Sequence, residues 1–194
     1  MSNQVETHVD VQLTSRNRTT VFWRGILVFP VAVFFGSFYQ IVHAGWSTPI
    51  IVLPAALALI FREVYPSYVL TFNHAVMELS TRISAYLFLL TDEYPSIERN
   101  PNIAVIFPDV EGGKKLNRWL PLVKWFLAIP LYIVGIIYAA LSALLTIYAW
   151  IATSITGNYP EVAAKTVLGT IEFWNRIYGY TVALVTDEYP SFAL

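Results

Sequence analysis

The sequence predicts an all-α membrane protein that is built as a tandem repeat. Hydrophobic residues make up 56% of the 194 residues and charged residues only 13%, whereas soluble proteins are about 25% charged. The string Thr-Asp-Glu-Tyr-Pro-Ser at 91–96 recurs at 186–191, and such internal repetition defines an architecture before any other feature. We therefore expect two units, residues 1–96 and 97–194.

Each unit is expected to hold two transmembrane helices, one interfacial amphipathic helix and one strand of a small strand pair. A helix needs about 20 mainly apolar residues to cross a bilayer. Apolar residues fill the stretches 21–42, 46–61 and 120–155. In the first unit they predict spans at about 21–42 and 46–62, separated by a turn rich in helix breakers at 43–49.

The third apolar stretch has two interpretations. As one helix, 120–155 would extend roughly 54 Å, which is too long for one ordinary crossing. It therefore forms either two crossings or one helix that projects well beyond the lipid. The repeat favours two crossings, with spans at about 120–137 and 140–156 and a tight hairpin near 135–142.

Matching residues extend the repeat well beyond the six-residue string. The second unit is six residues shorter between its proline and its Tyr-Pro pair, a contraction that falls at the turn of 43–49. This loss is why the second hairpin should be tight. The matching pairs are Arg24 with Lys124, Pro30 with Pro130, Tyr65-Pro66 with Tyr159-Pro160, Glu78 with Glu172, and Arg82 with Arg176.

A short alternating segment opens each unit. Apolar residues occupy every second position at Val9, Val11 and Leu13, and again at Ile103, Val105 and Phe107. Period-two alternation is typical of a strand. A lone hairpin of two strands is marginally stable, and we expect the two copies to pair with each other.

The Tyr-Pro pairs should mark the start of the amphipathic helices at about 67–90 and 161–185, because the residue before proline is pushed out of helical geometry. In both helices a glutamate precedes an arginine by four residues, Glu78 before Arg82 and Glu172 before Arg176. That spacing favours an ion pair worth about 0.2–0.5 kcal/mol on an exposed helix. We expect both helices to lie in the lipid interface with the apolar face down.

The basic residues predict the topology. Lysine and arginine precede or open the first span, lie between the two pairs of spans or at their edges, or follow the last span, and none occurs in the tip from His43 to Trp46. The positive-inside rule then places both termini and the central segment in the cytoplasm. The two units should be parallel repeats, related by an axis along the membrane normal. The polar first twenty residues lack the apolar core of a signal peptide, so we expect the first span to be retained as an anchor.

Two copies of one motif follow the amphipathic helices. Residues 82–86 read Arg-Ile-Ser-Ala-Tyr and precede Leu-Leu-Thr-Asp-Glu-Tyr-Pro at 89–95, and a related pattern covers 176–180 and 185–190. With the stretch from 116 to 130, these residues resemble a bacterial integral-membrane domain family of unknown function with tandem Arg-x-x-Ala-Tyr…Leu-Thr-Asp-x-Tyr-Pro repeats. The resemblance covers nearly the whole chain. It implies a multi-pass protein of the bacterial plasma (inner) membrane and implies no reaction and no catalytic residue.

The acidic strings are the first candidate site. Asp92-Glu93 and Asp187-Glu188 could form a four-carboxylate cation site if the two copies meet, because hard cations take oxygen ligands. We favour the simpler interpretation, in which each pair sits just past a helix end at the water boundary. Tyr94 and Tyr189 would then anchor the chain at the interface.

The arginines of the amphipathic helices are the second candidate site. Arg82 and Arg176 are expected to clamp the aspartate of their own string or that of the other copy, since a charge near lipid is usually paired. Contact with anionic lipid headgroups is the functional alternative. The full set of candidate interaction or clamp residues is Glu78, Arg82, Asp92, Glu93, Tyr94, Glu172, Arg176, Asp187, Glu188 and Tyr189.

Nothing in the sequence predicts catalysis. It holds no phosphate-binding glycine loop and no nucleophile motif, it has no cysteine, and we expect no cofactor and no metal site. A net charge of −1 argues against a nucleic-acid partner. We expect a non-enzymatic accessory or scaffold subunit of a larger membrane complex, with the lipid bilayer and other membrane subunits as partners. The alternatives are a small repeat-built transporter or channel, and a lipid-handling membrane protein.

Overall fold

The computed structural model describes residues 3–40, 49–98 and 100–194 as a mostly helical protein with one small antiparallel sheet. This confirms the predicted helical class and the small strand pair. In chain order the elements are β1 (Glu6–Val9), α1 (Arg18–Leu27), α2 (Phe29–Gln40), α3 (Pro49–Arg62), α4 (Ser67–Leu87), β2 (Ile103–Ile106), the 3-10 turns η1 (Glu111–Gly113) and η2 (Leu120–Leu122), α5 (Lys124–Leu127), α6 (Ile129–Thr156) and α7 (Glu161–Thr181).

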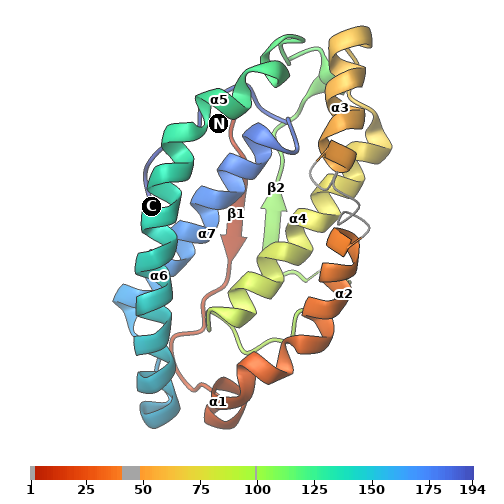
Figure 1. Cartoon of the computed structure of the whole chain (residues 1–194). Helices are drawn as coiled ribbons and strands as arrows, with labels where there is room; N and C mark the ends of the chain where they lie inside the picture. The colour runs from red at the N-terminus through yellow and green to blue at the C-terminus, as the bar shows by residue number, and fades with distance from the viewer. Residues whose placement is uncertain (1–2, 41–48, 99) are drawn as a thin grey trace.

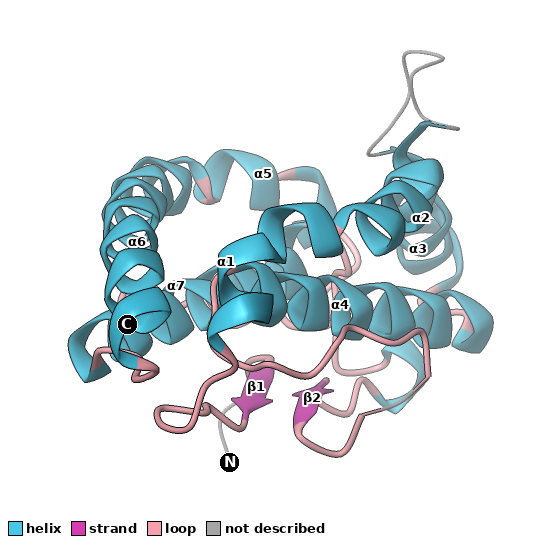
Figure 2. Ribbon diagram, turned by 90° about the horizontal axis from the view of Figure 1, so that it is seen from below, coloured by secondary structure: helices cyan, strands magenta, loops and turns pink. Residues whose placement is uncertain are grey.

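The elements form three layers. In the first, α2 and α3 follow one another along one long side, while α6 runs in the opposite direction along the other (Figure 1). The short helices α1 and α5 lie at opposite ends of this first layer. Helices α4 and α7 form the middle layer, and β1 and β2 lie on the far side of them (Figure 2).

Two prolines bend the first layer at matching places. A break at Val28 separates α1 from α2, and a break at Ala128 separates α5 from α6. Each break lies two residues before a proline. Proline has no N–H to donate to the carbonyl four residues earlier. The chain stays helical across both breaks, since Ala32 N donates to Val28 O and Tyr132 N donates to Ala128 O, each at 2.9 Å.

The predicted pair of spans at 120–137 and 140–156 is wrong, because α6 occupies most of this stretch. Helix α6 is one unbroken helix of 28 residues, about 42 Å long, and no hairpin forms near 135–142. The physical reason is packing, because Gly135 and Ser142 are two turns apart on the buried stripe that faces α7. Ser142 Oγ donates to Thr170 Oγ1 of α7 at 2.8 Å.

The first unit has no antiparallel hairpin either. Helices α2 and α3 run in the same direction, one beyond the other (Figure 1). The predicted turn falls mostly on 43–48, outside the described residues. The expected span at 21–42 corresponds to α1 and α2, and the expected span at 46–62 to α3.

The Tyr-Pro pairs begin helices as predicted. Pro66 and Pro160 precede α4 and α7 with the same backbone angles, φ −65° and ψ 126°. These helices form the middle layer and pack against other elements on both faces (Figure 2), and their expected position in a lipid interface stays a prediction. In α7, 12 of the 21 residues are buried, between α6 on one side and α4 and β1 on others.

The two predicted strands pair with each other, but the first strand lies closer to the N-terminus than predicted. Strands β1 and β2 are antiparallel, with Glu6 opposite Ile106 and Val9 opposite Ile103. Val9 and Ile103 are buried, while Glu6 and His8 are exposed on the outer face. Val11 and Leu13 lie beyond β1.

Both main cores combine residues from the two halves of the chain. One core packs Leu59 and Val69 against Leu184, and the other packs Leu90 against Ala149 and Val167. The tyrosine of each Tyr-Pro pair donates a hydrogen bond to the other half of the chain. The Tyr65 hydroxyl donates to Ala183 O, and the Tyr159 hydroxyl donates to Phe88 O at 3.0 Å. Burial raises the pKa of both phenols to about 12, so they remain protonated donors.

Two stretches of the described chain are long and apolar enough to cross a membrane, judged by length and composition alone. They are Arg18–Gly36 and Ile129–Thr156, with 22% and 17% of their most apolar windows buried. The core helix of a soluble protein would be mostly buried, and these stretches are mostly exposed.

Gly135 should be essential for the packing of α6 on α7. A Cβ there would lie 2.8 Å from Trp174 Cζ2 and 3.2 Å from Phe173 Cε1. We expect Gly135→Ala to lower the unfolding free energy by about 1–3 kcal/mol through overpacking, measured by thermal unfolding in detergent. The control is Gly25→Ala in α1, where no atom lies within 4 Å of the added methyl group. It should be neutral or stabilising by up to ~1 kcal/mol, and equal losses in both variants would contradict the assigned packing.

Candidate functional site

The first acidic string folds back onto the start of α1. Asp92 Oδ1 accepts from Arg16 Nη2 at 2.7 Å and from Arg24 Nη2 at 2.5 Å. Its other oxygen, Oδ2, accepts from the backbone N–H of Asn17 at 2.9 Å. The carboxylate of Asp92 thus joins two guanidinium groups and the N-cap residue of α1.

Both arginines at Asp92 are buried and bonded to the backbone around the string. Arg24 Nη1 donates to Thr91 O at 2.7 Å and to Tyr86 O at 3.2 Å. The Arg24 guanidinium also lies 4.3 Å from the centre of the Tyr86 ring. Arg16 Nη1 donates to Leu89 O at 2.6 Å. A buried cation needs such pairing, because desolvation would otherwise cost several kcal/mol.

The second acidic string repeats this arrangement at α5. Lys124 Nζ lies 2.8 Å from Asp187 Oδ1 and donates to Thr186 O at 2.6 Å. Asp187 Oδ2 accepts from the backbone N–H of Asn117 at 2.5 Å. The Lys124 ammonium lies 4.9 Å from the centre of the Tyr180 ring. Lysine thus fills the position that Arg24 fills in the first half.

The local turn that presents each aspartate is the same. Leu89 and Leu184 have positive φ angles of 67° and 56°, just beyond the ends of α4 and α7. The threonine side chain that precedes each aspartate then accepts the backbone N–H two residues on. These bonds run from Glu93 N to Thr91 Oγ1 at 3.2 Å and from Glu188 N to Thr186 Oγ1 at 3.1 Å.

The two sites differ in charge. Asp92 faces two cations, whereas Asp187 makes an ion pair with Lys124 alone among the described residues. Burial on its own would raise the pKa of Asp92. The hydrogen bonds from Arg16, Asn17 and Arg24 outweigh that effect and hold the pKa below its usual value, so Asp92 is ionised at neutral pH.

The prediction that Arg82 and Arg176 bind the aspartates of the acidic strings is wrong. Arg82 donates to the backbone carbonyls of Ser96, at 2.7 Å, and Glu98, and it does not reach Asp92. It also pairs with Glu78 at 3.4 Å, as the helical spacing predicted. Arg176 donates to the backbone carbonyl of Ala193. Both arginines therefore hold the chain that follows the string, while cations of α1 and α5 hold the string itself.

Glu172 and Arg176 form the half-buried counterpart of Glu78 and Arg82. Burial raises the pKa of Glu172, and the nearby Arg176 opposes that rise. Burial lowers the pKa of Arg176, and Glu172 opposes this in turn. Each group therefore makes the charged form of the other less costly.

The remaining predicted residues lie around the two strings. Glu93 accepts from Asn102 Nδ2 at 3.0 Å, and Glu188 accepts from Gln4 Nε2 at 3.0 Å. Tyr94 packs edge-on against Tyr86 with ring centres 5.6 Å apart, and Tyr189 packs against Tyr180 at 5.9 Å. Both tyrosines are partly exposed, as the anchor interpretation requires.

A four-carboxylate cation site does not form. Asp92 is bonded at α1 and Asp187 beside α5, and these helices lie at opposite ends of the molecule (Figure 1). Within 3–40, 49–98 and 100–194, no group of three or more metal-ligating side chains occurs.

The sequence contained a usable signal for the residues that the clamp prediction missed. Arg24 and Lys124 are cations at matching positions of two apolar stretches, and each needs an acidic partner there. The only acidic string repeated at matching positions is the one that holds Asp92 and Asp187. Arg16 gave no such signal, because the position in the second half that matches it is occupied by Leu116.

Comparison with known proteins adds no assignment: no protein-family model, curated protein or solved structure matches the chain. The resemblance to a bacterial membrane-domain family, which depends on the repeated motif and the stretch from 116 to 130, stays a prediction.

Removing the carboxylate should cost more stability at the first site than at the second. Asp92→Asn leaves Arg16 and Arg24 buried without a counter-charge, and arginine cannot lose its proton. We expect a loss of about 3–5 kcal/mol in unfolding free energy. Asp187→Asn leaves only Lys124 without a counter-charge, and a buried lysine can lose its proton. The loss in unfolding free energy should therefore be smaller than for Asp92→Asn. The comparison is by thermal unfolding in detergent.

The matched control is Asp10→Asn, since Asp10 is exposed next to β1. It should leave stability within about 0.5 kcal/mol of the parent protein. A larger loss for Asp187→Asn than for Asp92→Asn would contradict the ranking of the two sites.

Proposed function

We propose that the protein is a non-enzymatic membrane subunit, an accessory or scaffold protein that lies in one face of a bilayer. The uncharged stretches of its first layer, in α1 to α3 and in α5 and α6, would lie in hydrocarbon, and the charged ends of these stretches would lie at the border with water. Its sheet side would remain in water, where other subunits can bind. The observation that carries this proposal is the contrast between these two faces.

The first layer carries almost no charge. No aspartate, glutamate, lysine or arginine occurs between residues 25 and 61 or between 125 and 160. Arg24 and Lys124, next to these limits, are buried against their aspartates. Large exposed apolar side chains of this layer include Phe22, Trp23, Ile26, Phe29, Val33, Leu57, Phe61, Trp125, Phe126, Ile136, Leu144, Ile151 and Ile155.

Helix α6 is apolar around most of its circumference. Its buried residues form one narrow stripe, which holds Leu131, Gly135, Ser142, Ala149 and Thr153. Its exposed positions outside that stripe are mostly isoleucine, leucine and alanine. An outer helix of a soluble domain would carry polar residues opposite its buried stripe, so this pattern favours contact with lipid.

The sheet side has the opposite character. Glu6, His8 and Asp10 are exposed on or next to β1, and Glu93 and Glu98 are exposed in the segment after α4. Such groups are stable in water and costly in hydrocarbon, at about 2.5–3.5 kcal/mol for a charged residue at the centre of a bilayer.

The direction of the strands favours an in-plane orientation over a crossing. Strands β1 and β2 run along the long direction of the molecule, roughly parallel to the axis of α6 (Figure 1). If α6 crossed the bilayer, the exposed Glu6 and His8 and the open sheet edges would lie at membrane depth. Unpaired strand edges do not occur in hydrocarbon. Lying in the plane keeps the sheet in water.

The in-plane orientation also accommodates the positions of the two acidic strings. These lie at opposite ends of the long helices, so a crossing α6 would place them on opposite faces of the membrane. In the plane, both strings are on the same face. In this orientation, parallel repeats would be related by an axis along the membrane normal.

Lipid handling is the second candidate function, and one observation favours it. A mainly apolar cavity lies between α4, α6 and α7, and one of its walls belongs to the proposed lipid-facing layer. A scaffold needs no such cavity.

Cysteine labelling in sealed vesicles tests the orientation, because the parent chain has no cysteine. Thr19→Cys lies at the start of α1 and Lys115→Cys lies before η2, at opposite ends of the long helices, and both positions are exposed. We expect an impermeant maleimide to label both variants from the same side. Ile147→Cys, on the exposed face of α6, should remain unlabelled until detergent is added.

Labelling of Thr19→Cys and Lys115→Cys from opposite sides would establish a crossing and contradict the in-plane orientation. Ready labelling of Ile147→Cys in vesicles would contradict membrane insertion altogether.

Purification in mild detergent with mass spectrometry tests the subunit role. We expect a reproducible membrane-protein partner that is lost when the sheet side is reversed in charge by Asp10→Lys with Glu98→Lys. The matched control is Ile147→Ala with Ile151→Ala on α6, which should retain that partner. A lone monomer, or a partner unaffected by the charge reversal, would overturn the role assigned to the sheet side.

A further inference from the structure

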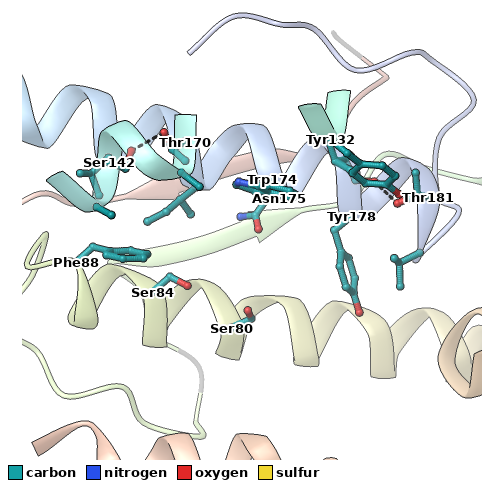
Figure 3. A pocket seen from close by; sticks show the side chains of 16 residues that line it. Ser80, Ser84, Phe88, Tyr132, Ser142, Thr170, Trp174, Asn175, Tyr178 and Thr181 are labelled. Atoms are coloured by element: carbon teal, nitrogen blue, oxygen red, sulfur yellow. Dashed lines mark hydrogen bonds between the residues drawn. The ribbon is translucent and has the colours of Figure 1, made fainter. Parts of the chain in front are cut away.

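A cavity of about 370 Å³ lies between α4, α6 and α7 (Figure 3). Its floor is α7, with Trp174 and Asn175 among the lining residues, and α4 contributes Ser80 and Ser84. Behind the floor lies β1, since Asn175 Nδ2 donates to Thr7 Oγ1 at 2.9 Å. The α6 wall belongs to the first layer, so the cavity lies between the middle layer and the apolar face.

The cavity wall carries no charge. None of the residues that line it is an aspartate, glutamate, lysine, arginine or histidine. A bound carboxylate or phosphate would need a cation or several N–H donors in so apolar a setting. Fatty acids and phospholipid headgroups are therefore poor occupants, and an uncharged molecule is favoured.

Two hydroxyl groups in the wall lack protein partners. In the described part of the chain, the side chains of Ser80 and Ser84 make no hydrogen bond to the protein. Neighbouring hydroxyls of the same helix do find partners, as when Thr81 Oγ1 donates to Met77 O at 2.9 Å. Both serines are half-buried and line the cavity, so their hydroxyl groups are accessible to a ligand there.

Asn175 lies across the cavity from this serine pair (Figure 3). Its amide nitrogen is fixed by two bonds, to Thr7 Oγ1 at 2.9 Å and to Thr81 Oγ1 at 3.0 Å. These bonds orient the side chain and leave its carbonyl oxygen as an acceptor. Ser80, Ser84 and Asn175 together form one uncharged polar spot that can both donate and accept.

The rest of the wall is apolar and aromatic. Phe88, Tyr132 and Trp174 contribute rings, and Tyr132 stacks on Trp174 with an interplanar angle of 20°. A dry cavity of roughly 150 Å³ already binds benzene, and pockets for small molecules begin at about 300 Å³. The space therefore accommodates a flat ring or part of a hydrocarbon chain.

We propose that this cavity binds an uncharged lipid that carries one hydroxyl or carbonyl oxygen. The oxygen would bond to the Ser80, Ser84 and Asn175 spot, and the hydrocarbon part would pack against the aromatic wall. Such a ligand would enter from the bilayer past α6. The site deepens the lipid-handling alternative and rests on the proposed insertion in a membrane.

The test uses a long-chain alcohol that carries a photoreactive diazirine, added to the full-length protein in phosphatidylcholine vesicles. Crosslinked peptides should come from the cavity walls of α4 and α7. The fatty acid of the same length and the same diazirine should label them at least fivefold less. Equal labelling by the acid would overturn the uncharged class of ligand.

Neighbouring alanines of α6 provide matched variants. Ala139 lines the cavity, whereas Ala140 is exposed on α6 and does not line it. Ala139→Phe should reduce crosslinking at least fivefold by filling the space, and Ala140→Phe should leave it unchanged. Equal effects of the two variants would mean that the probe reports general lipid contact, and would overturn the site.

The serine pair provides the polar control. Ser80→Ala with Ser84→Ala should lower labelling by the alcohol roughly tenfold, the effect of losing about one to two neutral hydrogen bonds, and should not change labelling by an alkane with the same diazirine. Equal losses for both probes would overturn the assigned polar spot. Failure here is distinct from failure of membrane insertion, because insertion is read separately from the protection of Ile147→Cys.

Discussion

Two buried cations shape this fold. Arg24 and Lys124 sit at the start of long apolar helical stretches, where no water can solvate them. Each obtains its counter-charge from an aspartate that follows a different helix, Asp92 after α4 and Asp187 after α7. Because a buried charge without a partner is so costly, the chain after each middle-layer helix must turn back to the first layer. The ion pairs thus hold the two helical layers together.

The sequence predicted the features that depend on local chemistry. The Tyr-Pro pairs begin α4 and α7 because proline restricts the residue before it, and alternation at Val105 and Ile103 marked β2. It left one continuous helix and two crossings both open for 120–155 and favoured the wrong one, since Gly135 is as consistent with a turn as with close packing on Trp174. It also did not predict that Arg82 binds backbone carbonyls. That choice depends on where the loop at 96–98 lies in space.

The layered arrangement explains why α4 and α7 look amphipathic without lying on a surface. Their polar residues, such as Glu78 and Glu172, face the sheet and the chain that follows the acidic strings. Their apolar residues pack in the two cores, where Met77 of α4 meets Val105 of β2 and Ile171 of α7 meets Val9 of β1. The two-sided character of such a helix therefore reflects two different neighbours, and neither needs to be water or lipid. The same residue pattern can place a helix in the middle of a three-layer protein.

The crossed tyrosine bonds limit how the chain can be made. Tyr65 belongs to the first half, but its acceptor is Ala183, near the end of the second. On the ribosome, a nascent chain that has reached residue 96 already contains a complete copy of the motif, yet the two main cores still lack 5 and 7 of their 12 buried residues. The core residues of the first half therefore remain partly uncovered until α7 and the chain after it have been synthesised.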